Sequence, residues 1–228
     1  MLTFHIVTIF PEILENYFNV GMMKKAQEEN LADFLVYNLR DCSQDKHRKV
    51  DDTPYGGGPG MVMRVDVINN CVEDIKSKIK EERGEEALVK TKTILFSAKG
   101  KSFDQKRAIR WCGEISDFIL ICGRYEGVDE RVVKKIADEE ISVGKYILTG
   151  GELPAMIVAD AVTRLIPGVL GNKESLSWES FSAKEEEDRL DYPVYTRPES
   201  YKGWKVPQVL LSGHHHEIEK WRKKNSKL

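Results

Sequence analysis

The stretch EISVGKYILTGGELPAM, Glu140–Met156, decides the fold of this chain. It joins a short β-forming run to two adjacent glycines and then to an apolar helix predicted over Glu152–Ile166. A glycine turn before a helix often holds a phosphate, but this turn lacks both the lysine of a P-loop and the pattern G-x-G-x-x-G. We therefore expect a loop that holds a ligand without phosphate groups.

Outward from this stretch, short β-rich runs alternate with helical stretches. The expected strands are Thr3–Ile9, Asp33–Leu39, Lys92–Ser97, Asp117–Cys122 and the short run Lys145–Leu148. This alternation predicts an α/β fold, a mainly parallel sheet with helices on both faces. Such sheets bind ligands beyond the carboxyl ends of their strands, so we expect one site where the loops SAKGK, CGRYEG and LTGGELP converge.

Composition is that of a globular protein with one substantial core: 228 residues, 41% hydrophobic, net charge −2. The charge is uneven, because residues 191–228 hold eight Lys and Arg against four Asp and Glu, a net charge of +4 that leaves −6 for the rest. The four cysteines form no C-x-x-C pair, so neither a disulfide framework nor a zinc ribbon is expected. No apolar run approaches the roughly 20 residues that span a bilayer, and we expect a soluble, cytoplasmic protein without a membrane partner.

Several motifs have an ordinary interpretation beside a functional one. The glycine-rich Gly56–Arg64 has the composition of a flexible loop, while the preceding DKHRKVDD would suit a phosphate backbone. The neighbouring histidines 214–216 would point in different directions on a helix, so no metal site is predicted. In the helix after the two glycines, Asp160, Thr163 and Arg164 form a polar stripe, and Arg164 is either a surface arginine or faces a cleft.

The loop CGRYEGVDER combines backbone amides, a flat ring and a carboxylate within one turn. Tyr125 and Glu126 lie between two glycines at the end of an expected buried strand. This combination suits a ligand that has a flat base and a cationic group.

Five segments, taken in order, carry a resemblance to one family: DDTPYGGGPGMVMR, CGRYEGVDERV, ISVGKYILTGGELPAMIVADAVTRLIPGVLG, LDYPVYTRPESYKGWKVPQVLLSGHH and EIEKWR. Over essentially the whole chain they resemble the bacterial tRNA (guanine-N1)-methyltransferases. The resemblance implies a SPOUT-class α/β fold with a deep trefoil knot, a small helical C-terminal domain and a homodimer with its active site at the subunit interface. It also implies methyl transfer from S-adenosylmethionine to N1 of the guanine at tRNA position 37, which maintains the reading frame, with a possible Mg²⁺ requirement and no role for DNA.

The same resemblance divides the chain into three parts. Residues 1–168 would form the knotted domain that binds S-adenosylmethionine, and residues 169–190 a flexible interdomain linker that carries the catalytic carboxylate. Residues 191–228 would form a basic, mainly helical domain that binds tRNA. The sequence alone leaves open a related SPOUT enzyme with another RNA target, and a catalytically silent RNA-binding protein.

The resemblance assigns the cofactor to three loops. Ala98 stands where the family often has proline, which should change the stiffness of the loop more than its chemistry. The residues expected to bind the cofactor are Ser97, Ala98, Gly123, Tyr125, Glu126, Ser142, Val143, Gly144, Lys145, Tyr146, Ile147, Leu148, Gly150, Gly151 and Pro154.

Two residues are expected to act in catalysis. Guanine N1 carries a proton, so the reaction needs a base, and a cation near O6 would stabilise the developing charge. The resemblance gives the O6 contact to Arg164 and the base to Glu179, which stands in WESF where the family has the aspartate of a DSF motif. For tRNA the candidates are Arg197, Lys202, Lys205, Arg222 and Lys223. Trp204 and Trp221 either stack on RNA or pack in the protein, and packing is the expected role.

Overall fold

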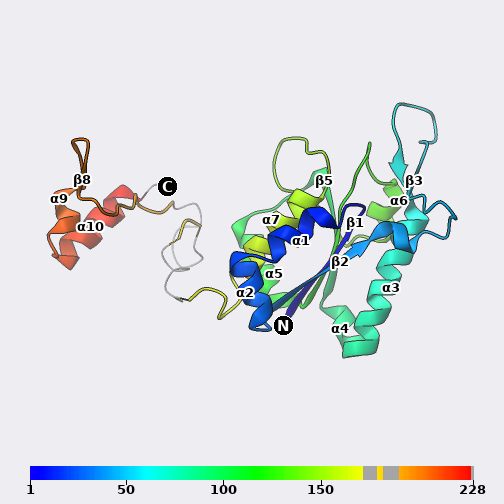
Figure 1. Ribbon diagram of the computed structural model, residues 1–228, viewed down its shortest axis with the longest axis horizontal. Coiled ribbons are helices and arrows are strands. Elements are labelled where there is room, and N and C mark those ends of the chain that lie inside the picture. Colours follow the sequence, from blue (N-terminus) through cyan, green and yellow to red (C-terminus); the bar gives the residue numbers. More distant parts are fainter. Residues whose placement is uncertain (172–178, 182–189, 227–228) are drawn as a thin grey trace. The chain divides into compact units, whose positions relative to one another are not determined.

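The computed structural model of the chain describes residues 1–171, 179–181 and 190–226, and the chain divides into a first unit, Met1–Gly171, and a second unit, Asn172–Leu228. The first unit is built on a five-stranded sheet with strand order β2-β1-β6-β5-β7, in which every neighbouring pair is parallel (Figure 1). Its strands are β1 (Leu2–Thr8), β2 (Ala32–Asn38), β5 (Thr91–Ser102), β6 (Asp117–Ile121) and β7 (Glu139–Ser142).

Helices cover both faces of this sheet (Figure 1). One buried cluster joins the sheet to α1 (Glu12–Phe18), α2 (Gly21–Glu28), α5 (Gln105–Glu114) and α7 (Glu152–Thr163). A second cluster joins the opposite face to α3 (Val65–Arg83), α4 (Glu85–Val89) and α6 (Glu130–Lys135). Because both faces are covered, strands such as β1 and β6 are buried along their whole length.

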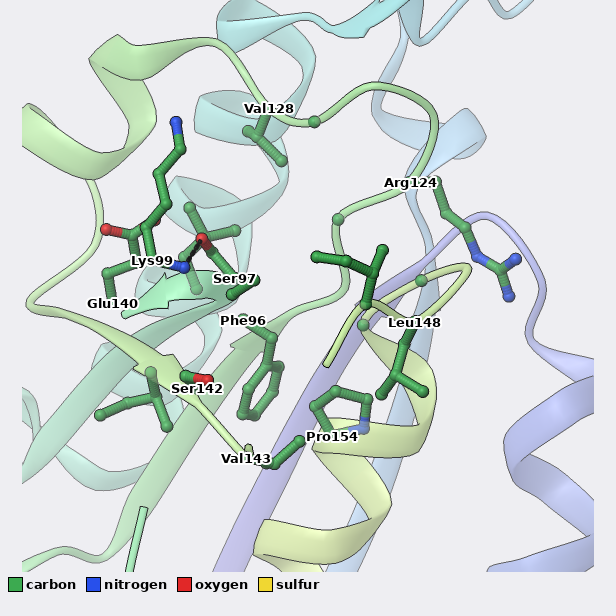
Figure 2. A pocket seen from close by; sticks show the side chains of 18 of the residues that line it. Phe96, Ser97, Lys99, Arg124, Val128, Glu140, Ser142, Val143, Leu148 and Pro154 are labelled. Atoms are coloured by element: carbon green, nitrogen blue, oxygen red, sulfur yellow. Dashed lines mark hydrogen bonds between the residues drawn. The ribbon is translucent and has the colours of Figure 1, made fainter. Parts of the chain in front are cut away.

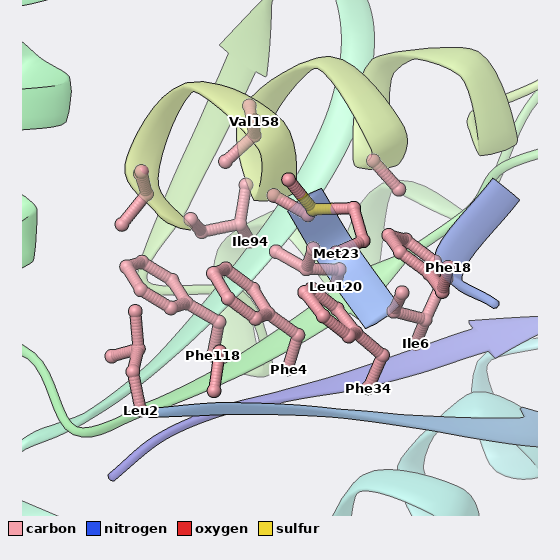
Figure 3. Packing of buried hydrophobic residues seen from close by; sticks show 14 of the residues in the cluster. Leu2, Phe4, Ile6, Phe18, Met23, Phe34, Ile94, Phe118, Leu120 and Val158 are labelled. Atoms are coloured by element: carbon pink, nitrogen blue, oxygen red, sulfur yellow. The ribbon is translucent and has the colours of Figure 1, made fainter. Parts of the chain in front are cut away.

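Alternation along the strands decides which cluster each side chain joins. Phe4 of β1 is paired in register with Phe34 of β2 and with Phe118 of β6, so the three rings share one face. They stack with centroid separations of 5.3 and 5.1 Å, and Phe18 of α1 extends the row onto Phe34 at 4.3 Å (Figure 3). This row fixes the register of the central strands against the helices above them.

The remaining elements are short. In the first unit a 3-10 helix, η1 (Leu39–Cys42), precedes a small hairpin of β3 (Asp51–Asp52) and β4 (Val62–Met63). The second unit contains a hairpin of β8 (Ser200–Tyr201) and β9 (Trp204–Lys205), followed by α9 (Gln208–Leu211) and α10 (His215–Asn225). Within the described ranges, no helix is long and apolar enough to cross a membrane.

The structure confirms four of the five predicted strands and corrects the fifth. Lys145–Leu148 belongs to a loop, and the edge strand is β7, six residues earlier. Ile141 of β7 is fully buried, whereas Ile147 is 84% exposed. β7 begins with two glutamates, so its sequence lacks the apolar pattern of a buried strand. In the fold Glu139 forms ion pairs with Lys92 and Arg107, which allow it to start the strand.

The predicted helix after the two glycines is confirmed as α7, which ends at Thr163, three residues earlier than expected. Within the predicted polar stripe, the side chain of Thr163 is fully buried. Asp160 and Arg164 remain partly exposed.

Candidate functional site

A cavity of about 310 Å³ lies at the carboxyl edge of the sheet (Figure 2). Three segments line it: residues 97–99, residues 123–128 and residues 142–151. The first lies within β5, and the other two follow β6 and β7; these three strands are neighbours in the sheet, and parallel strands bring such segments to one edge. The predicted convergence of the three glycine-bearing loops is therefore confirmed.

The first segment is an excursion within β5. The pairing of β5 with β7 shifts register between Phe96 and Lys101, and both of these residues face Ile141. The residues between them leave the ladder, and Ser97 accepts a hydrogen bond at its Oγ from the N–H of Lys99 at 3.0 Å. A strand irregularity of this kind turns side chains toward a site at the sheet edge.

The second and third segments meet backbone to backbone. The N–H of Gly151 donates a hydrogen bond to the carbonyl oxygen of Gly123 at 2.9 Å. A Cβ atom added to Gly151 would lie 2.6 Å from the Cα of Cys122, far inside van der Waals contact. Only glycine permits this approach, so the glycine turn of the opening stretch closes one loop of the cavity onto another.

A buried ion pair fixes the same junction. Glu152 is 1% exposed, and its Oε2 accepts a hydrogen bond from Nε of Arg124 at 2.9 Å. Its Oε1 accepts from the hydroxyl of Thr8 at 2.7 Å, which ties the end of β1 to the start of α7. The guanidinium of Arg124 also lies 4.8 Å from the ring centre of Phe10. A buried carboxylate needs this full set of partners, and the set holds the two loops together.

The second loop is further attached to the β3–β4 hairpin. The N–H of Met63 donates to the carbonyl of Gly127 at 3.0 Å, and the N–H of Glu126 donates to the carbonyl of Met61 at 3.1 Å. Composition predicted a flexible loop for Gly56–Arg64, and this is wrong for its second half, which is bonded to the wall of the cavity. At the tip of the second loop, Tyr125 has a positive φ of 61° and stands 46% exposed.

The third loop folds back on itself. The hydroxyl of Tyr146 donates to the carbonyl of Val143 at 3.2 Å, and the hydroxyl of Ser142 donates to the carbonyl of Gly144 at 3.0 Å. Behind the wall, burial raises the pKa of the Cys122 thiol well above its ordinary value, so this side chain stays neutral. The cavity therefore has a preformed, tightly packed wall.

The structure places every residue expected to bind the cofactor around this cavity except Lys145, whose side chain is exposed and does not line it. Prediction from sequence missed Phe96, Lys99, Arg124, Glu140 and Thr149, which also line it. Figure 2 shows Ser97, Val128 and Leu148 reaching it from three different segments. A signal for the Arg124 pair was present in the sequence, since Glu152 is a carboxylate in the first turn of an otherwise apolar helix.

Arg164, one of the two predicted catalytic residues, does not line the cavity. Arg164 is the partly buried C-cap of α7, ten residues beyond Pro154, so it stands about 15 Å along the helix axis from the cavity. Glu179 belongs to the second unit. One turn before Arg164, Asp160 accepts a hydrogen bond from the hydroxyl of Tyr17 at 2.5 Å, and this bond helps raise the pKa of Tyr17 to about 12.

The tRNA candidates of the second unit fall into two groups. Trp221 packs beside Tyr195, and the Arg222 guanidinium lies 4.8 Å from the ring centre of Tyr192. Trp204 does not pack as predicted, since it is 72% exposed. Arg197, Lys202, Lys205 and Lys223 are exposed as well.

Arg124 is neutralised by its ion pair with Glu152, and among the other charged side chains around the cavity the acidic ones outnumber the basic ones. Glu126, Glu130 and Glu140 line it together with Lys99. In the part of the chain that the structure describes, no group of three or more His, Cys, Asp and Glu side chains could hold a metal ion. The cavity therefore suits a ligand with positive charge better than a phosphate.

Comparisons with known proteins give one consistent result. A family model described as tRNA (Guanine-1)-methyltransferase TrmD matches residues 2–228. A tRNA (guanine-N(1)-)-methyltransferase of Dictyoglomus turgidum is 50% identical over 226 residues, which cover 99% of this chain and 85% of that protein. Proteins of the same name from Halalkalibacterium halodurans and Clostridioides difficile are each 45% identical, over 96% and 98% of this chain and 84% and 91% of their own length.

Proposed function

Because this chain belongs to the tRNA (guanine-1)-methyltransferase TrmD family, we propose that its first unit holds the methyl donor while its second unit engages the tRNA. The protein is an S-adenosylmethionine-dependent methyltransferase that acts on guanine N1 in tRNA. The target within tRNA is the guanine at position 37, beside the anticodon, and the modification maintains the reading frame. Since the substrate is tRNA, the proposed location is the cytoplasm.

The cavity of the first unit is the proposed site of S-adenosylmethionine, and its lining is the main support for the proposed function. This cofactor has a flat base, a sulfonium and an ammonium but no phosphate. Backbone held close by Gly123 and Gly151, together with the carboxylates around the cavity, matches those groups. When bound, the cofactor supplies an electrophilic methyl group on its sulfonium.

The chain itself supplies proton transfer and charge stabilisation. Glu179 removes the N1 proton of guanine, and its carboxylate replaces the aspartate of the family with one more methylene. Arg164 donates hydrogen bonds to O6, where negative charge collects as the proton leaves. The segment 169–190 is proposed as a linker that orders on tRNA and delivers Glu179, so catalysis waits for the substrate.

The position of Arg164 supports a homodimer with composite sites, which is part of the proposal. An arginine about 15 Å along α7 from Pro154 cannot reach the cavity of its own chain, so a second copy would provide it. The packed helices α1, α2 and α7, with the connection between α1 and α2, expose apolar side chains that a second copy could cover, namely Ile13, Tyr17, Val20, Met22, Leu153 and Ile157.

The trefoil knot of SPOUT proteins is also part of the proposal. Its support is local: α7 starts where Gly151 presses against Cys122 and Gly123, so the third loop passes directly beside the second. Threading of this kind would fix the cavity wall without a disulfide or metal.

Methyl transfer to tRNA transcripts tests the activity. Purified protein with radiolabelled S-adenosylmethionine should label a transcript with guanine at position 37 and leave the same transcript with adenine there unlabelled. Labelling of both would point to another RNA position, and labelling of neither would indicate a silent RNA-binding protein. Calorimetry without RNA should show binding of the cofactor, because the whole cavity belongs to the first unit.

Mixed dimers test the composite site. At a concentration of S-adenosylmethionine well below its dissociation constant, a chain with Arg164→Ala should be nearly inactive alone, and a chain with Gly151→Ala should keep about one tenth of the wild-type rate. After mixing, half of the dimers are mixed and each has one complete site, so about one quarter of wild-type activity should return. If nothing returns although light scattering shows mixed dimers, Arg164 serves its own chain and the composite arrangement is wrong.

A further inference from the structure

The β8–β9 hairpin of the second unit presents two aromatic rings to solvent. Trp204 is 72% exposed and Tyr201 is 53% exposed. Rings of this size are usually buried in a core or reserved for an interface, because exposing them to water is unfavourable. The other described tryptophan of this unit, Trp221, packs beside Tyr195 instead. The exposed pair is therefore a candidate contact surface.

The hairpin holds both rings on the same side. Tyr201 and Trp204 are directly opposite each other in the strand register, so their side chains project from one face. Lys202 and Gly203 form the turn with φ angles of 50° and 84°, the signs of a two-residue turn that suits a tight hairpin. The ring centroids lie 5.8 Å apart at an interplanar angle of 62°, so each ring limits the rotation of the other. The pair is thus preorganised.

Two lysines lie next to the pair in the sequence of the hairpin. The ammonium of Lys202 lies 5.4 Å from the ring centre of Tyr201, and Lys205 follows Trp204 on β9. Both lysines are exposed, in a region whose net charge over residues 191–228 is +4. Aromatic rings flanked by cations are the combination that binds unpaired nucleotides, with bases stacked on the rings and phosphates beside the lysines.

We infer that the Tyr201–Trp204 pair is an RNA-contact site on which an unpaired base of the substrate tRNA stacks, while Lys202 and Lys205 contact neighbouring phosphates. This inference rests on the proposed function and adds a second contact point, separate from the methylated guanine. It assigns Trp204 to substrate affinity and leaves the chemical step to other residues.

Steady-state methylation by the full-length protein, with tRNA varied at saturating S-adenosylmethionine, tests the site. Trp204→Ala should raise the KM for tRNA about tenfold and leave kcat within about twofold, since stacking on one ring is lost. Trp204→Phe keeps a flat ring and should recover most of the affinity. Lys202→Ala should lower the slope of log affinity against log salt by about 1, whereas Lys220→Ala, whose side chain is paired with Glu217 at 3.0 Å on α10, is the matched control.

The outcomes distinguish failure of the contact site from failure of the proposed function. A wild-type enzyme that methylates tRNA, with Trp204→Ala and Tyr201→Ala unchanged in KM for tRNA, overturns the contact site and leaves the proposed function standing. A Phe variant that loses as much as the Ala variant excludes stacking and also overturns it. If Trp204→Ala instead dissociates the protein in sedimentation, the ring packs against a second copy. Failure of the wild type to label any tRNA would overturn the proposed function itself.

Discussion

The two units differ in how much of their structure is buried. In the first unit two hydrophobic clusters fill both faces of the sheet, and even charged groups such as Glu152 are sealed inside. Among the described residues of the second unit none is buried, and Trp204 is exposed to solvent. A packed interior holds atoms in fixed positions, whereas exposed side chains have fewer neighbours that restrain them. We therefore expect the first unit to tolerate little change and the second to respond in graded steps.

The largest effect should come from Arg164, at the far end of the rigid helix α7. Arg164→Ala should reduce the single-turnover rate of methyl transfer by about 10³-fold, the upper scale for losing one donor to a developing oxyanion. The dissociation constant of S-adenosylmethionine should stay nearly constant, because the residue does not line the cavity. Arg110→Ala, at an exposed arginine of α5, is the control and should retain normal rates. A near-normal rate for Arg164→Ala would remove this residue from catalysis.

The buried ion pair gives the next effect, and it concerns stability. Glu152→Ala leaves Arg124 without its carboxylate and should cost about 3 kcal/mol of unfolding free energy. Glu28→Ala removes an exposed pair with Lys24 on α2 and should cost less than about 1 kcal/mol. Urea unfolding followed by tryptophan fluorescence measures both. Equal losses would mean that the first unit is no more constrained at its cavity than at its surface.

Glu179 provides a catalytic test in the second unit, to be set beside Arg164 of the first. Glu179→Gln should slow methyl transfer about 10²-fold while cofactor affinity stays unchanged, the scale for removing a general base. Glu179→Asp should remain active, because the proposed linker would make up one methylene as it orders on tRNA. Single-turnover rates measure both variants. If Glu179→Gln keeps a normal rate, Asp191 is the next candidate, since its N–H is bonded to the neighbouring Ser180 hydroxyl oxygen at 2.9 Å.

Close backbone contact at the cavity gives a smaller, more local effect. Gly151→Ala should weaken S-adenosylmethionine binding about tenfold, because the new methyl group forces the third loop away from Cys122. Gly113→Ala is the matched control, since a Cβ there meets nothing within 4 Å. Calorimetry of the two variants measures the difference. Equal affinities would show that the junction between the loops does not shape the cofactor site.

Sequence patterns predicted the parts of the fold that depend on local order. The apolar composition of Asp117–Ile121 predicts a buried strand, and the glycine turn predicts the start of α7. The partnership of Glu152 with Arg124 depends on two segments 28 residues apart, and no local pattern encodes that distance. The edge strand β7 was missed because its first two residues are glutamates, one of which is paired with Lys92 of β5 and Arg107 of α5.

The smallest effect is expected at Lys145, where sequence resemblance and structure disagree. Resemblance assigns it to the cofactor, but its side chain is exposed and does not line the cavity, while its neighbours Gly144 and Tyr146 do. Lys145→Ala should therefore change the dissociation constant of S-adenosylmethionine by no more than about twofold, because the variant keeps the backbone and loses only a solvated side chain. Calorimetry beside Gly151→Ala supplies the scale. A tenfold loss would mean that the side chain of Lys145 contacts the bound cofactor. The third loop would then change its conformation when the cofactor binds.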